Sequence, residues 1–186
     1  GTYQGTFHLS LGFDLFQEEQ YQRLLKSAAQ AVLAARQGAK PAKLGAGIWD
    51  GWDRGDDIYA DRRDEDDSFL GPDGKPIGKH KEQRLLVLRI DDEADQPLAV
   101  VTSFPMHGTV GGGDNPLVST DATGHVELAL EERFDRPVMV MHIQGPAGDV
   151  SPQGRGGLSR CDAKTTLCEN FAKMESIGEL AAPRII

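Results

Sequence analysis

Apolar residues recur at helical spacing between residues 17 and 37, in the stretch QEEQYQRLLKSAAQAVLAARQ. The repeating positions are Leu24, Leu25, Ala28, Val32 and Ala35. Ala, Leu, Gln and Arg favour helices, and the acidic Glu18 and Glu19 suit the N-terminal end of a helix dipole. Gly38, followed shortly by Pro41, suits the C-terminal end. The pattern therefore predicts a helix over residues 17–37.

Three short apolar stretches after this helix predict strands. The first is AKLGAGIW at 42–49, and the next two are RLLVLRI at 84–90 and PLAVVTSF at 97–104, separated by the acidic turn DDEADQ. The Leu and β-branched content of the last two favours a hairpin or adjacent buried strands. Residues 50–81 are charged, rich in Gly and Pro, and without sustained periodicity, which predicts a long loop of functional or mobile character.

A second helix and a further strand follow. STDATGHVELALEERF at 119–134 has helical apolar positions, and Ser119, Thr120 or Asp121 could cap its N-terminus. PVMVMHI at 137–143 is an apolar run, and its His142 is expected to be a hydrogen-bonded core histidine. The succession of strand, loop, helix and strand predicts an α/β fold with mixed β-sheet layers flanked by helices.

Composition and charge narrow the classes of partner. The chain has 186 residues, enough for one ordinary core, and a formal net charge of -9, so no basic surface is available to neutralise nucleic-acid phosphates. No apolar run approaches the roughly 20 residues of a membrane span. The chain opens on GTYQGTFH without Met and stops on ELAAPRII within a helical pattern. We therefore expect residues 1–186 to be a fragment of a single domain that lacks N-terminal and C-terminal portions.

The two cysteines, Cys161 and Cys168, are separated by six residues in a polar stretch. They lack the neighbouring ligands of a zinc knuckle. A local disulfide is the preferred interpretation, and two free thiols are the alternative. A disulfide would indicate a secreted or periplasmic protein.

The first candidate for chemistry is His107, which directly follows an apolar strand and a proline. Side chains at strand ends are held in place by the sheet, and imidazole serves as a zinc ligand or a general base. The glycine-rich GTVGGGD that follows, beginning at Gly108, leaves room for a ligand near the backbone. The alternative is a histidine that closes the loop through hydrogen bonds.

The second candidate is Ser151 in AGDVSPQG, after the last predicted strand. Gly148 permits unusual dihedral angles, and Asp149 can brace a turn through side-chain hydrogen bonds to the backbone. The following proline restricts the serine to an extended or turn geometry. The segment does not match G-x-S-x-G, so it is not the nucleophile elbow of an α/β-hydrolase. From spacing alone, an ordinary turn serine remains the alternative.

Taken together, FPMHGT, LVSTDATGH and GDVSP, in this order, resemble the neutral/alkaline non-lysosomal ceramidase family, in its N-terminal catalytic domain. The resemblance extends upstream to KEQRLLVLRIDDEADQPLAVV and to WDRGDD, which sits where the family has an Asn-Arg-Ser-Pro segment. It extends downstream to RCDAKTTLC, where the family also has cysteines.

The resemblance implies a zinc-dependent amidase that cleaves ceramide into a fatty acid and sphingosine. His107 would be a zinc ligand, Ser151 the active-site serine, and Arg54 the active-site arginine. Gly108 and Asp149 are expected to contact substrate. Zinc polarises an amide carbonyl, arginine stabilises an oxyanion, and a serine hydroxyl attacks or donates to the same centre. We therefore expect His107 and Ser151 to converge on one cleft.

The resemblance also carries departures. The family's first zinc ligand precedes the segment that resembles GTYQ, and its remaining glutamate and tyrosine ligands follow well downstream of the serine motif. His125 and Gln153 stand where the family has Tyr and often Asn. The chain is therefore expected to act only when assembled with other fragments of the same precursor. An amidase for another lipid or N-acyl amide, and a non-catalytic lipid-binding homologue, stay open, as does peripheral contact with a membrane.

Overall fold

The computed structural model describes most of the chain, which divides into two units, residues 1–42 and 43–186. The described residues are 18–61, 72, 81–112, 115, 117, 119–148, 150–153 and 165–186.

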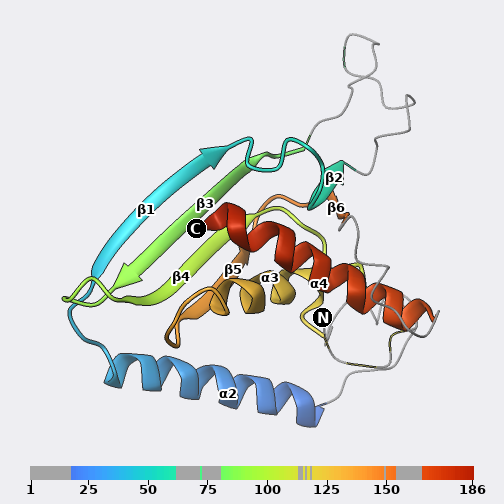
Figure 1. Cartoon of the computed structure of the whole chain (residues 1–186). Helices are drawn as coiled ribbons and strands as arrows, with labels where there is room; N and C mark the ends of the chain where they lie inside the picture. Colours follow the sequence, from blue (N-terminus) through green and yellow to red (C-terminus); the bar gives the residue numbers. More distant parts are fainter. Residues whose placement is uncertain are drawn as a thin grey trace. The chain divides into compact units, whose positions relative to one another are not determined.

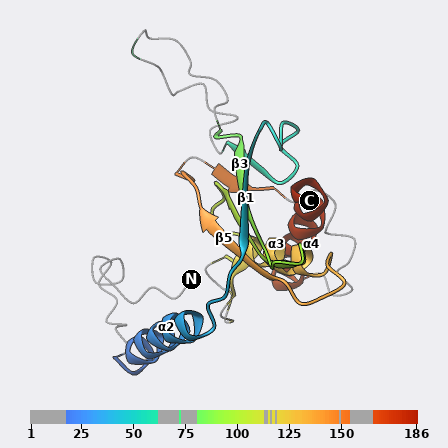
Figure 2. The ribbon, with the colours of Figure 1, turned by 90° about the vertical axis from the view of Figure 1, so that its left-hand side faces the viewer.

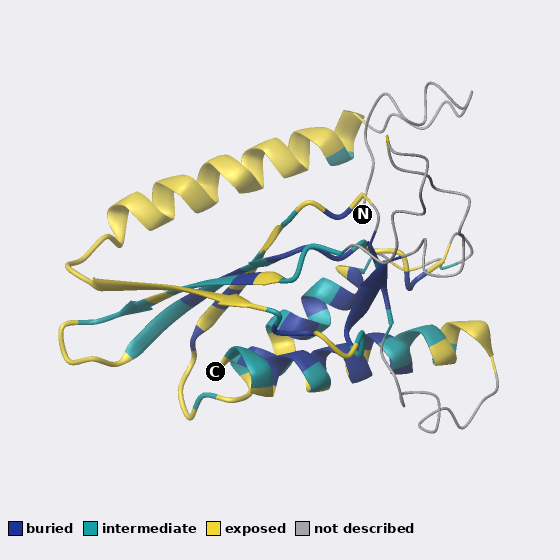
Figure 3. Ribbon diagram, turned by 90° about the horizontal axis from the view of Figure 1, so that it is seen from above, coloured by how far each residue is buried: buried dark blue, intermediate teal, exposed yellow. Residues whose placement is uncertain are grey.

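The first unit contains one described helix, α2 (Glu18–Gln37), which confirms the predicted element to within one residue. Two acidic residues occupy its first turn and Arg36 its last, as the helix dipole favours. The helix ends where the Gly38 backbone donates to the carbonyl oxygen of Ala34 at 2.9 Å. None of its residues is buried, and Figure 3 shows it exposed along its length.

The second unit is built on a four-stranded sheet in the order β1-β3-β4-β5 (Figure 1). The strands are β1 (Lys43–Asp50), β3 (Arg84–Asp91), β4 (Pro97–Phe104) and β5 (Met139–Gln144). β3 pairs antiparallel with both β1 and β4, and β4 pairs parallel with β5. The sheet is therefore mixed, as the sequence predicts.

The turn between β3 and β4 forms the predicted hairpin. The carboxylate of Asp92 accepts hydrogen bonds from the backbone N–H groups of Ala94 and Gln96, both at 2.9 Å. Asp95 adopts a positive φ of 61°, which an Asp tolerates better than most residues. The acidic turn is thus shaped by its own side chains.

Two helices, α3 (Asp121–Glu131) and α4 (Thr166–Ile185), lie on one side of this sheet (Figure 2). α3 provides the crossover between the parallel strands β4 and β5, which such a pair requires. Gly178 lets α4 approach α3 closely, because a Cβ atom there would lie 2.8 Å from the backbone carbonyl carbon of His125. The buried residues gather between the helices and the sheet, and include Leu85, Val126 and Ile177.

A separate two-stranded sheet corrects the sequence-based expectation for two segments. β2 (Tyr59–Asp61) lies within the predicted loop, and β6 (Val150–Pro152) lies within the predicted turn. The two strands pair antiparallel, with Ala60 opposite Ser151. Three-residue strands are too short to show an alternating pattern, and their pairing joins positions far apart in the chain.

No helix among the described residues is long and apolar enough to cross a membrane.

Candidate functional site

Three predicted site residues lie on segments that are anchored in the same hydrophobic core. They are Arg54, His107 and Ser151. Arg54 lies in the turn after β1, His107 follows β4, and Ser151 lies in β6. A buried residue of this core lies one or two positions before each site residue. These core residues are Trp52 before Arg54, Met106 before His107 and Val150 before Ser151. A shared core fixes the three backbones relative to one another.

Aromatic contacts link the turn after β1 to the end of β4. The ring centroids of Trp52 and Phe104 are 4.9 Å apart, and those of Tyr59 and Phe104 are 6.1 Å apart. Trp52 Nε1 donates to the hydroxyl of Tyr59 at 2.9 Å, and this hydroxyl donates to the Glu82 carbonyl at 3.1 Å. Burial raises the pKa of Tyr59 far above its ordinary value, so this hydroxyl stays a neutral donor.

The imidazole of His107 is half-buried and oriented by a backbone group. Its Nδ1 atom lies 2.5 Å from the carbonyl oxygen of Ala147, in the segment after β5. A carbonyl oxygen only accepts, so Nδ1 carries the proton and Nε2 presents its lone pair. Near the same strand ends, Gly145 N–H donates to the Phe104 carbonyl at 3.1 Å. His107 is thus held at the carboxyl ends of two adjacent parallel strands, where functional residues of such sheets gather.

The loop after His107 is held by Asp121, at the start of α3. Its buried carboxylate accepts from the backbone N–H groups of Val110 at 3.2 Å, Gly111 at 2.8 Å and Ala122 at 2.7 Å. Asp121 has a φ of 57°, and its own N–H donates to Ser119 Oγ at 2.9 Å. The sequence identified Asp121 only as a possible cap, and its role in ordering the preceding loop was missed.

Gly108 is exposed in this loop, as a residue that contacts substrate would be. A Cβ atom there would lie 3.4 Å from Asp121 Cβ, which is ordinary contact distance. The packing of this loop against Asp121 therefore does not require glycine at position 108. The expected contact of Gly108 with substrate stays a prediction.

Ser151 is half-buried in β6, between the buried Val150 and Pro152. Its backbone is fixed through the β2 partner Ala60, and the N–H of Gln153 donates to the Ile58 carbonyl at 2.8 Å. The expected turn is thus a short strand, which orients the serine through backbone pairing instead of through a turn. Asp149 lies outside the described residues.

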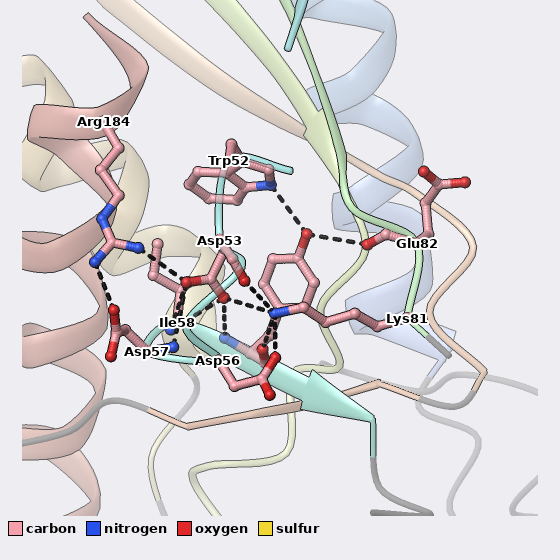
Figure 4. Close-up of polar contacts among 9 residues, drawn as sticks. Trp52, Asp53, Asp56, Asp57, Ile58, Lys81, Glu82 and Arg184 are labelled. Carbon is pink, nitrogen blue, oxygen red and sulfur yellow. Dashed lines mark hydrogen bonds and ion pairs between the residues drawn. The ribbon is translucent and has the colours of Figure 1, made fainter. Parts of the chain in front are cut away.

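The turn from β1 to β2 is organised by Asp53, which is fully buried (Figure 4). Its carboxylate oxygens accept from the backbone N–H groups of Asp57 at 3.2 Å, Ile58 at 3.2 Å and Tyr59 at 3.1 Å. Three backbone donors converging on one carboxylate fix the path of the whole turn.

Two cations from other parts of the chain complete the contacts of Asp53. Lys81 Nζ lies 3.1 Å from Asp53 Oδ2 and 2.6 Å from Asp56 Oδ1. Arg184, in the last turn of α4, lies 2.9 Å from Asp53 Oδ1 and 2.7 Å from Asp57 Oδ2. The sequence predicts a charged loop here, and no local pattern in it indicates this buried network.

Arg54 is exposed at the surface of the same turn. Gly51 has a φ of 70°, and a Cβ atom there would collide with the Arg54 guanidinium, so glycine lets this side chain fold over the turn. Among the described residues, no hydrogen bond or ion pair joins Arg54, His107 and Ser151 to one another. A cleft shared by their side chains therefore stays a prediction.

The predicted zinc ligand, His107, lies in the described part of the chain. The Nε2 atom of His107 suits zinc, because the carbonyl on Nδ1 fixes the ring as it does for many zinc ligands. No group of three potential ligand side chains lies together among the described residues. The ring centroids of His142 and Phe104 are 4.3 Å apart, and His142 Nδ1 lies 3.4 Å from Thr102 Oγ1. His142 is half-buried, and this burial lowers its pKa, so the side chain has the predicted hydrogen bond but is not fully in the core.

The predicted disulfide is not formed among the described residues. Cys168 carries a free, half-buried thiol in the first turn of α4, and its N–H donates to Thr165 Oγ1 at 3.3 Å. Cys161 lies outside the described residues, so the pairing stays a prediction.

An apolar pocket of about 200 Å³ opens beside the segments that lead to His107 and Ala147. It is lined by Ile48, Glu82, Arg84, Leu86, Ser103, Phe104, Pro105, Gly145 and Pro146. Arg84 Nη2 lies 2.6 Å from Glu82 Oε2, and the hydrogen bond from Arg84 lowers the pKa of Glu82 to about 2. The lining thus combines apolar side chains with one ion pair.

Comparison with known proteins finds one family over nearly the whole chain. The family model for the neutral/alkaline non-lysosomal ceramidase N-terminal region matches residues 1–181. Neutral ceramidase B of Dictyostelium discoideum is 25% identical over 174 residues, covering 86% of this chain and 23% of that protein. Neutral ceramidase A of the same organism is 24% identical over 169 residues, covering 82% and 23%.

The solved structures agree on the fold. The neutral ceramidase from Pseudomonas aeruginosa superposes with a TM-score of 0.71 at 19% identity, over 91% of this chain and 26% of that chain. A ceramidase complexed with C2 gives a TM-score of 0.70 at 19% identity, with the same coverage. The α/β fold with a flanked mixed sheet is thus confirmed. The chain spans about a quarter of the length of these relatives.

Proposed function

The chain belongs to the neutral/alkaline non-lysosomal ceramidase family, and we propose that it supplies part of a site that hydrolyses the N-acyl amide bond of ceramide. The products are a fatty acid and sphingosine. Both Dictyostelium relatives bear the name neutral ceramidase, which supports this substrate class.

The observation that carries the proposal is the common anchoring of Arg54, His107 and Ser151. Their backbones leave one buried core, and His107 is oriented through Ala147, four positions before Ser151. Amide hydrolysis needs a group that polarises the carbonyl, a donor to the developing oxyanion and a hydroxyl near the same carbon. These three residues are of the types that supply such groups.

Each residue has a distinct role in the proposal. His107 would hold zinc through Nε2, and zinc, when bound, supplies Lewis-acid polarisation of the amide carbonyl. The Arg54 guanidinium donates hydrogen bonds to the carbonyl oxygen as negative charge develops there. In one route the Ser151 hydroxyl attacks the carbonyl carbon, its proton passes to the amine as the C–N bond breaks, and water then hydrolyses the Ser151 ester to release the fatty acid. In the other route Ser151 orients a water molecule that attacks the same carbon, and a proton from that water leaves with the amine.

The apolar pocket beside the strand ends supports a lipid-like substrate. Its lining is mostly apolar, and burial of an alkyl segment contributes about 0.8 kcal/mol for each methylene. We further propose a secreted or periplasmic location, which the expected Cys161–Cys168 disulfide motivates.

The test uses the longest natural form of the protein, since the chain spans a quarter of its relatives. Zinc content is measured together with hydrolysis of a short-chain N-acylsphingosine and of a simple N-acyl amide. Near-stoichiometric zinc with release of sphingosine supports the proposal. Turnover of the simple amide alone favours an amidase for another substrate. A folded protein with neither zinc nor turnover is a non-catalytic homologue and contradicts the proposal.

A further inference from the structure

Asp53 is adjacent in sequence to Arg54, yet the two side chains have opposite surroundings. Asp53 is fully buried and Arg54 is exposed. The Asp53 carboxylate accepts from the N–H groups of Asp57, Ile58 and Tyr59, which closes the turn back onto the start of β2. The conformation that directs Arg54 outward is therefore set by the group that points inward beside it.

The charge of this carboxylate does more than close a turn. Asp92 shapes the β3–β4 turn with two backbone hydrogen bonds and no buried cation. Asp53 instead meets two cations, Lys81 just before β3 and Arg184 at the end of α4. Lys81 Nζ also donates to the Asp53 carbonyl at 2.5 Å and to the Tyr59 carbonyl at 2.7 Å. Buried charges are costly unless they are well paired, so these contacts hold three distant segments in one arrangement.

A short chain of backbone hydrogen bonds connects Asp53 to the strand of Ser151. The Ile58 N–H donates to Asp53 at 3.2 Å, and the Ile58 carbonyl accepts from Gln153 N–H at 2.8 Å. Ala60, two residues further along, pairs with Ser151. Asp53 thus contacts the turn of Arg54 on one side and the strand paired with Ser151 on the other.

We propose that Asp53 is a positioning residue for amide hydrolysis, which sets the place of the Arg54 guanidinium relative to Ser151. The inference rests on the proposed function, because it assigns Arg54 a part in that reaction. A misplacement of about 1 Å at a reacting centre can lower the rate about 100-fold. Loss of the Asp53 charge therefore lowers kcat, and it does so only while Arg54 is present.

The test is a double-mutant cycle in the longest natural form of the protein, with N-acylsphingosine as substrate. Asp53→Asn keeps the size of the side chain and removes its charge. It is expected to lower kcat at least about tenfold in the presence of Arg54, and less than about twofold in the Arg54→Ala background. Amide hydrogen exchange at Ile58 and Tyr59 is expected to become faster in both backgrounds.

Arg184→Gln provides a milder second variant if Asp53→Asn does not fold, since Arg184 is partly exposed. It is expected to lower kcat in the same direction and, again, only with Arg54 present. Asp92→Asn is the matched control, because it removes a turn-shaping carboxylate at the opposite end of the β3–β4 hairpin. Its kcat should equal that of the wild type.

The possible outcomes distinguish failure of the positioning role of Asp53 from failure of the proposed amide hydrolysis. Equal losses of kcat in both Arg54 backgrounds, or no loss at all, overturn the positioning role while the proposed function stands. A folded, zinc-supplied wild-type protein that hydrolyses no N-acyl amide overturns the proposed function, and the positioning role is rejected with it.

Discussion

The Nδ1 atom of His107 lies 2.5 Å from the carbonyl oxygen of Ala147, so the segment after β4 is tied to the segment after β5. Because the carbonyl accepts the Nδ1 proton, the imidazole is fixed in the tautomer whose Nε2 carries a lone pair. The contact orients a potential metal ligand and also joins the His107 segment to the chain that leads into Ser151.

His107→Ala is expected to lower the zinc affinity of the longest natural form at least about tenfold, because one ligand and its oriented lone pair are lost. Chelator competition with metal analysis measures the change. His142→Gln is the control, since that ring packs against Phe104 instead of facing a ligand set. Unchanged zinc affinity in His107→Ala would remove His107 from the metal site.

Arg54→Ala is expected to lower turnover at least about tenfold, because loss of one oxyanion donor costs about 2.7–4 kcal/mol. Arg54→Lys should lower turnover less, because lysine keeps the positive charge but lacks the planar guanidinium with its paired N–H donors. Steady-state kinetics with N-acylsphingosine provides the measurement. The control is Arg89→Ala, which removes an exposed arginine that pairs with Asp91 in β3, an inner strand of the four-stranded sheet. Wild-type turnover in Arg54→Ala would return this residue to an ordinary surface role.

Asp121→Ala is expected to lower the free energy of unfolding by about 3 kcal/mol. It leaves three backbone N–H groups without their acceptor and places Ala at a positive φ, which costs about 1–2 kcal/mol by itself. Asp121→Asn should cost less, because Asn keeps an oxygen acceptor and tolerates this backbone conformation. Urea unfolding measures both variants, and equal stability of Asp121→Ala and the wild type would refute the role of this carboxylate.

Gly178→Ala is expected to destabilise the protein by about 1–3 kcal/mol, because the added methyl group on α4 meets the His125 backbone on α3. Gly47→Ala is the matched control in β1. A Cβ atom there meets nothing within 4 Å, so its stability should change little. Thermal unfolding of both variants checks the prediction. It fails if Gly178→Ala and Gly47→Ala have the same unfolding temperature.

Local patterns predicted the larger elements and missed those formed by distant pairing. The helix at 17–37 and the β3–β4 hairpin were recognisable because periodicity and turn residues act over a few positions. β2 and β6 have three residues each, and each is stabilised only by the other. Their short length left no pattern to read.

The site residues divide in the same way. Arg54, His107 and Ser151 were found through short motifs that resemble a family. Asp53 looked like one acid in a charged loop, because its burial depends on Lys81 and on Arg184, which lies 131 positions away in the chain. The sequence likewise did not indicate that Ala147 orients His107, because this contact depends on the pairing of β4 with β5.

The most direct measurement of the central claim is the hydrolysis of N-acylsphingosine by the Ser151→Ala variant of the longest natural form. Ser27→Ala, on the exposed face of α2, is the control. If Ser151 works at one site with His107 and Arg54, Ser151→Ala keeps its zinc and its unfolding temperature but loses at least about 100-fold in kcat. Wild-type kcat in Ser151→Ala, with zinc bound and the fold intact, would contradict the account.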